Sequence, residues 1–132
     1  MILPDTHTLL WYMALNPRLG TQAEHRILRS RILGEVAFSA ISVWEVALLL
    51  AKGRLTLNVS AIQWRQNLLG AGFIEIPVDG AIAARSVALP DFHDDPADRI
   101  IVATALDGHQ LITDDRDILN WPGLLNRFPA GR

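Results

Sequence analysis

The chain has 132 residues, with 12 basic and 14 acidic side chains and a formal net charge of −2 at pH 7. It contains no cysteine, which excludes disulfide bonds, thiolate catalysis and cysteine-ligated zinc. The total charge does not support a general electrostatic affinity for nucleic acid. Basic residues do cluster locally at two places, Arg26, Arg29 and Arg31, and Lys52 with Arg54. The length predicts one domain, residues 1–132, large enough to bury a core.

The longest apolar run, residues 36–51, is interrupted by Ser39, Ser42 and Glu45. It is too short and too interrupted to span a bilayer. The N-terminus shows no basic segment followed by an apolar one, as a signal peptide would have. Together with the absence of cysteine, these features predict a cytoplasmic protein that does not enter a membrane.

In the first half of the chain, short apolar segments alternate with helical patterns. In chain order these segments predict a strand at residues 1–3, helices at 9–13 and 21–33, a strand at 36–38 and a helix at 43–52. Pro4 suits the end of the first strand, because proline cannot donate to a strand ladder. Asp5 or Thr6 can cap the helix that follows.

The second half continues the alternation. After a connector at 54–59, the pattern predicts a helix at 61–69, a strand at 73–78, a helix at 81–89, a loop at 90–93, a helix from Pro96, a strand at 111–112 and a helical turn around Ile118. Asp95 can cap the helix that begins at Pro96, and Gly108 ends it. The tail after Trp121 predicts no regular structure.

Short apolar strands that alternate with helices are typical of an α/β domain with a mostly parallel sheet. Right-handed crossovers bring the carboxyl ends of parallel strands to one edge, where ligand sites of open α/β sheets lie. Asp5 follows the first strand, and the pair Asp114 and Asp115 follows the strand at 111–112. These acids are therefore expected near each other, with Asp115 preferred over Asp114 as the site acid.

Two more acids are candidates from within predicted helices. Ser42 and Glu45 match a capping box, which would give Glu45 a purely structural role. Glu45 is also the only charged residue in a helix that is apolar nearly all round, and a buried acid needs a partner. Asp98 lies in the first turn of its helix, on the same stripe as the apolar Ile101 and Ala105.

The four acids Asp5, Glu45, Asp98 and Asp115 point together to a metal site. At an effective dielectric constant of about 20, two carboxylates about 4 Å apart repel by roughly 4 kcal/mol. They can share a pocket only if cations lie among them or some pKa values rise. Oxygen ligands in this number suit Mg²⁺ or Mn²⁺, which can activate a water and neutralise a phosphodiester leaving group.

Other chemistries have less support. The histidines show no paired zinc spacing, the serines no GxSxG motif, and the glycines no P-loop or GxGxxG motif. Most of the histidines are expected to be structural. His93 is the exception, because it precedes Asp94 and Asp95 at the mouth of the expected site.

Four stretches resemble, in order and spacing, the PIN-domain ribonucleases, and specifically the VapC-type toxins of toxin–antitoxin modules. They are residues 2–7 (ILPDTH), 39–47 (SAISVWEVA), 92–105 (FHDDPADRIIVATA) and 111–115 (LITDD). The chain departs from the family pattern at Pro4, where another apolar residue is usual. It also departs at Asp114, which adds an acid beside the expected fourth one.

The resemblance implies a three-layer α/β/α sandwich and an endoribonuclease that depends on Mg²⁺ or Mn²⁺. It assigns the acidic roles to Asp5, Glu45, Asp98 and Asp115, with Thr113 as a supporting hydroxyl. It also implies an RNA substrate, a cognate antitoxin and commonly a homodimer, which would account for the many apolar residues. The alternatives are a nuclease of structured DNA, a phosphatase, a binding module that holds an ion without catalysis, and helix caps alone.

Overall fold

The computed structural model describes residues 1–132. Strands and helices alternate along the chain in the order β1 (Ile2–Pro4), α1 (Thr6–Met13), α2 (Thr21–Ile32), β2 (Ala37–Ser39), α3 (Ala40–Ala51), α4 (Ala61–Gly70), β3 (Ile74–Ile76), α5 (Gly80–Ala88), α6 (Pro96–Ala105), β4 (Gln110–Thr113), α7 (Arg116–Leu119) and β5 (Arg127–Pro129). None of the helices has the length and apolar character needed to cross a membrane.

All strand pairings are parallel. β4 lies between β1 and β5, and β2 pairs with β3. A parallel bridge between Ile2 and Val36 joins the two groups, and the Ile2 amide donates to the Glu35 carbonyl at 3.0 Å. The strands therefore follow the order β3–β2–β1–β4–β5, and their carboxyl ends share one edge.

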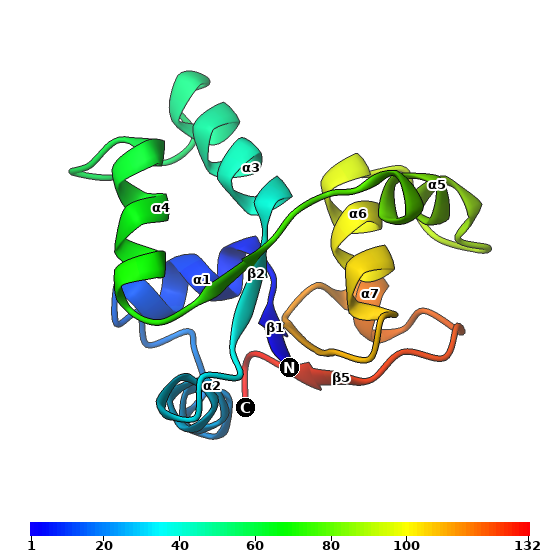
Figure 1. Ribbon diagram of the computed structural model, residues 1–132, viewed down its shortest axis with the longest axis horizontal. Helices are drawn as coiled ribbons and strands as arrows, with labels where there is room; N and C mark the ends of the chain where they lie inside the picture. The colour runs from blue at the N-terminus through cyan, green and yellow to red at the C-terminus, as the bar shows by residue number, and fades with distance from the viewer.

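Successive strand residues alternate between two hydrophobic clusters, one on each face of the sheet. Phe38 and Ile112 belong to the cluster beneath α1, α2 and α4, whereas Ala37 and Leu111 belong to the cluster beneath α5, α6 and α7. Figure 1 shows α1 and α4 on one side of the strands and α6 and α7 on the other. The expected α/β/α sandwich is confirmed.

Helix α3 begins earlier than the sequence pattern predicted. Ser39 is its N-cap and accepts the Ile41 amide, so the helix starts at Ala40. Ser42 lies inside the helix and accepts a hydrogen bond from the Thr6 hydroxyl at 2.9 Å. The predicted Ser42–Glu45 capping box is therefore wrong, and Glu45 lies beyond the first turn, where it has no capping role.

The prediction that α3 is buried all round is also wrong. Only Ser42 and Val46 are buried in this helix, and Trp44 is 50 % exposed. The reason is geometric, because α3 extends outward from the carboxyl edge of the sheet and leaves its outer face uncovered (Figure 1). The core of this chain therefore accounts for only part of the apolar residues of α3, namely Val46 and the partly buried Ile41, Val43 and Leu50.

The C-terminal tail, for which no structure was predicted, forms the edge strand β5. Phe128 lies opposite Ile112 and is buried, and the Ala130 amide donates to the Thr113 carbonyl at 2.8 Å. This pairing holds Thr113 in the middle of a sheet, not at an edge. The position of Thr113 bears directly on the candidate site.

Candidate active site

All the predicted acids line one pocket of about 300 Å³ at the carboxyl edge of the sheet. The lining residues are Asp5, His7, Trp11, Glu45, Asp95, Asp98, Asp114 and Asp115. Six of these eight are carboxylates, which follow β1 and β4, lie in α3, or lie at the start of α6. The sequence argument that strand exits would bring Asp5 and the Asp114–Asp115 pair together is confirmed.

Asp5 is buried, and both of its oxygens are engaged. Oδ1 accepts the Thr8 amide at 3.0 Å, which makes Asp5 the N-cap of α1. Oδ2 accepts the Thr113 hydroxyl at 2.5 Å. Asp5 can therefore cap α1 and still offer oxygen lone pairs to the pocket, because a carboxylate has about four lone-pair sites and these two bonds use only two of them.

The start of α6 brings two acids to the pocket. Asp95 is the N-cap and accepts the Asp98 amide at 3.0 Å, with Pro96 in the first helical position as predicted. Asp98 faces inward, with a side chain that is 18 % exposed, and its Oδ2 lies 3.4 Å from Nε2 of His93. His93 Nδ1 accepts the Asp95 amide at 3.3 Å, whereas His93 Nε2 is buried and has no hydrogen-bond partner.

Asp114 and Asp115 both line the pocket, but they differ in their bonds. Asp115 caps α7 through the Ile118 amide, at 3.1 Å, and its own amide donates to the Thr113 hydroxyl oxygen. Asp115 is partly buried, whereas Asp114 is exposed. Asp115 also raises the pKa of Asp98, and Asp114 is not among the groups that do so. The geometry favours Asp115 as the fourth acid.

Mutual repulsion and burial perturb these acids strongly. Burial is the largest cause of the raised pKa of Asp98, which reaches about 8, and the next causes are the charges of Asp95, Asp115, Glu45 and Asp5. Burial also raises the pKa of Asp5 and of Glu45, in Asp5 against the lowering effect of its hydrogen bonds. The pocket therefore holds more negative charge than its own hydrogen bonds compensate, and a bound cation would relieve this excess.

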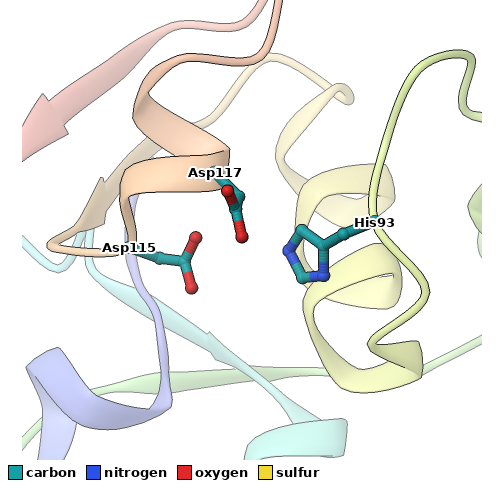
Figure 2. A group of neighbouring side chains, drawn as sticks. All are labelled: His93, Asp115 and Asp117. Atoms are coloured by element: carbon teal, nitrogen blue, oxygen red, sulfur yellow. The ribbon is translucent and has the colours of Figure 1, made fainter.

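The carboxylates are spread around the pocket. No three of Asp5, Glu45, Asp98 and Asp115 offer oxygens that all lie within 4.8 Å of one another. A group of that compactness forms instead from His93, Asp115 and the exposed Asp117, where the imidazole faces the two carboxylates at the start of α7 (Figure 2). The four-acid arrangement suits an ion that keeps several waters, as Mg²⁺ does.

Sequence reasoning missed four residues of this region. Asp95 was predicted as a helix cap at the mouth of the site, His7 as a structural histidine, and Trp11 and Asp117 were given no place in the site. Their positions depend on how α1 and the loop before α6 approach each other, which no local pattern encodes. One signal was present for Asp95, because the run Asp94–Asp95 adds charge next to a helix that already has an acid in its first turn.

Comparisons with known proteins agree on the family. The model of the PIN domain matches residues 2–123. The chain is 37 % identical to "Ribonuclease VapC22" of Mycobacterium tuberculosis over 117 residues. The aligned region covers 87 % of this chain and 87 % of that protein.

Among solved structures, a "Toxin-antitoxin complex from Klebsiella pneumoniae" is similar at 26 % identity and a TM-score of 0.61, covering 95 % of this chain and 96 % of that one. A structure of FitAB bound to a DNA fragment is similar at 25 % identity and a TM-score of 0.67, covering 100 % of this chain and 96 % of that one. The match over residues 2–123 spans nearly the whole sequence, and so the chain belongs to the PIN domain family.

Proposed function

We propose that this protein is an endoribonuclease that uses Mg²⁺ or Mn²⁺ and acts as the toxin of a toxin–antitoxin pair. The observation that carries the proposal is the convergence of Asp5, Glu45, Asp98 and Asp115 on one pocket in a chain of the PIN family. The likeness to a relative named as a ribonuclease supports an RNA substrate, which would place the site of action in the cytoplasm.

The residues of the pocket fit a hard divalent cation. Their donors are carboxylate oxygens, the ligands that Mg²⁺ and Mn²⁺ prefer, and no cysteine is present to favour a softer metal. Burial raises the pKa of Asp98 most, and the neighbouring carboxylates raise it further; a cation would offset this second contribution. An ion bound here would lower the pKa of a water molecule and neutralise charge on the scissile phosphate.

The side chains around the acids would keep this arrangement in place. Thr113 orients Asp5 through Oδ2 while the Thr8 amide holds Oδ1, and both bonds favour the ionised carboxylate. His93 lies beside Asp98, with Nε2 3.4 Å from Oδ2, and its Nε2 is buried without a hydrogen-bond partner, so it could contact a ligand of the pocket. Asp98 and Asp5 would hold the ion, with Glu45 and Asp115 completing its surroundings.

Cleavage assays with the purified chain test the proposal. A labelled single-stranded RNA, the DNA of the same sequence and a small phosphate ester are incubated with Mg²⁺, with Mn²⁺ or with a chelator. The proposal predicts internal cleavage of the RNA only with metal, and its loss in D5N and D98N proteins that still fold. Cleavage of DNA alone, or undiminished activity in both variants, would contradict it.

Exposed apolar side chains support protein partners. Leu28, Ile32 and Leu33 on and after α2 are exposed, and so is Trp44 on α3. Side chains of this kind become covered when chains associate. The similar toxin–antitoxin complex supports an antitoxin as one partner of this chain, and a second copy of the chain is the other proposed partner.

Expression in a bacterial host tests the toxin role. The wild-type chain is expected to arrest growth, and the D98N chain to be tolerated at the same protein level. Co-expression of the protein encoded next to this chain should restore growth and copurify with it. Light scattering of the purified chain would report the homodimer, which is expected at twice the 14.6 kDa mass of the chain.

A further inference from the structure

A second groove begins where the acidic pocket ends. It has a volume of about 360 Å³ and is lined by residues of α1, of the turn after it, of the end of α3 and of the connector that follows α3. His7 and Trp11 line both the groove and the acidic pocket. The two hollows are therefore adjacent and share part of their walls, and an extended molecule could reach across both.

The charged residues that line the two hollows have opposite signs. Six carboxylates line the acidic pocket, but no acid lines the groove. Two arginines, Arg18 and Arg54, line the groove instead, and both are exposed.

These two guanidinium groups are also free of partners. Neither makes an ion pair or a side-chain hydrogen bond. In contrast, Arg65 is paired with Glu75, Arg85 with Asp107, and Arg99 donates to three backbone carbonyls. Structural roles thus account for those arginines and leave Arg18 and Arg54 available to a ligand.

We propose that this groove binds the segment of single-stranded RNA next to the cleaved phosphodiester. Arg18 and Arg54 contact backbone phosphates, and a base stacks on the half-buried indole of Trp11 at the junction. This inference rests on the proposed function and adds the direction in which the substrate leaves the active site.

The charge pattern favours RNA over an acidic peptide as the occupant. Both would be attracted by Arg18 and Arg54, but an occupant that continues into the acidic pocket meets six carboxylates. A phosphate can enter there when a divalent cation lies between it and the acids, which is the condition for cleavage. Stacking on Trp11 further requires a planar ring, which every nucleotide supplies.

The test compares two double variants that remove the same charge. R18A/R54A changes the groove, and R29A/R132A removes two exposed arginines that line neither hollow. For each we would measure kcat and KM for RNA cleavage. Binding of a fluorescent RNA oligonucleotide is measured separately by anisotropy, in a D98N background that stops cleavage.

R18A/R54A is expected to raise KM and Kd about tenfold or more with kcat unchanged. The slope of log Kd against log salt should fall by about 1.4, since each phosphate contact to a single strand contributes about 0.7. R29A/R132A should change neither constant. RNA should also quench the fluorescence of the wild-type chain more than that of W11F, which lacks the stacked indole.

If the two double variants bind RNA equally well while the wild-type chain still cleaves RNA, the groove is not an RNA-binding site. The proposed nuclease function would be unaffected by that result. Binding of a polyglutamate peptide but not of RNA to the groove would make it a peptide site and also overturn the inference. Absence of RNA cleavage by the wild-type chain would instead count against the proposed function itself.

Discussion

The Thr113 hydroxyl donates to Oδ2 of Asp5 at 2.5 Å and accepts the amide of Asp115 at 3.0 Å. β1 and β4 pair in parallel with Pro4 opposite Ile112, so Asp5, which follows β1, lies beside Thr113, the last residue of β4. One buried hydroxyl thus links the acid that follows the first strand to the acid that follows the fourth. Asp5 and Thr113 are 108 positions apart along the chain.

Replacing Thr113 with valine should affect both stability and cleavage. T113V leaves an oxygen of the buried Asp5 without its donor, which is expected to lower the free energy of unfolding by about 1–3 kcal/mol. Cleavage should fall as well, since Asp5 loses its fixed orientation. Urea unfolding and RNA cleavage check this, with T113S as the control that keeps the hydroxyl. Equal losses in T113S and T113V would show that the hydrogen bond is not the cause.

The stability of the metal-free protein should decrease as pH rises. The pKa of Asp98 is 3.8 in an unperturbed chain and about 8 in the fold. Between these values the folded state holds a proton that the unfolded state has released, so the free energy of unfolding falls with rising pH. The raised pKa values of Asp5 and Glu45 act in the same direction.

D98N should remove most of this dependence, because asparagine has no proton to lose. Urea unfolding midpoints of the wild-type and D98N proteins, measured in chelator at pH 5, 6, 7 and 8, would give the slope of stability against pH for each protein. A wild-type midpoint that rises across this range, or a D98N slope equal to the wild-type slope, would contradict the assigned pKa.

Divalent ions should stabilise the folded protein. Binding to the folded state alone adds about 2.7 kcal/mol to the free energy of unfolding when the ion is at 100 times its Kd. Thermal unfolding with and without Mg²⁺ or Mn²⁺ measures this gain, which D98N should largely abolish. D117N is the matched control, and a gain lost in D117N but kept in D98N would place the ion beside His93 and Asp117.

Arg99 is expected to position the loop that carries His93 and Asp95. Its guanidinium donates to the carbonyls of Phe92, His93 and Ser86 at 2.7–2.9 Å. R99A should lower the free energy of unfolding by about 3 kcal/mol, since several partly buried bonds to a charged donor are lost together.

The R99K protein should be more stable than R99A but less stable than the wild-type chain, because lysine lacks the planar guanidinium fork that reaches several carbonyls at once. R65A, which breaks the solvent-exposed pair with Glu75, should lower the free energy of unfolding much less than R99A does. Equal unfolding free energies of R99A and R65A proteins would exclude the positioning role.

The sequence was sufficient to predict the order of the elements as far as α7 and the convergence of the acids. Parallel strands share a carboxyl edge, so residues that follow strands, such as Asp5 and Asp115, meet without any knowledge of side-chain contacts. Asp98 was predicted to face inward because it lies on the apolar stripe of its helix. These predictions depend on local periodicity and a general rule of topology.

The parts that failed depend on tertiary contacts. Ser39 and Ser42 can both cap a helix, and Ser42 is instead bonded by Thr6, which is distant in sequence. β5 has only Phe128 as a buried apolar residue, too little pattern to predict a strand without its partner β4. The apolar run of α3 predicted burial, but composition alone does not tell an apolar surface that the core of the chain covers from one that it leaves exposed.

Diffraction from crystals soaked in Mn²⁺, with the anomalous signal of manganese, tests the central claim most directly. The account predicts an anomalous peak within the pocket, in contact with Asp5 and Asp98 and with Glu45 or Asp115 beside it. The peak should vanish in D98N crystals. A peak confined to His93, Asp115 and Asp117, or no peak at Mn²⁺ concentrations that support RNA cleavage, would contradict it.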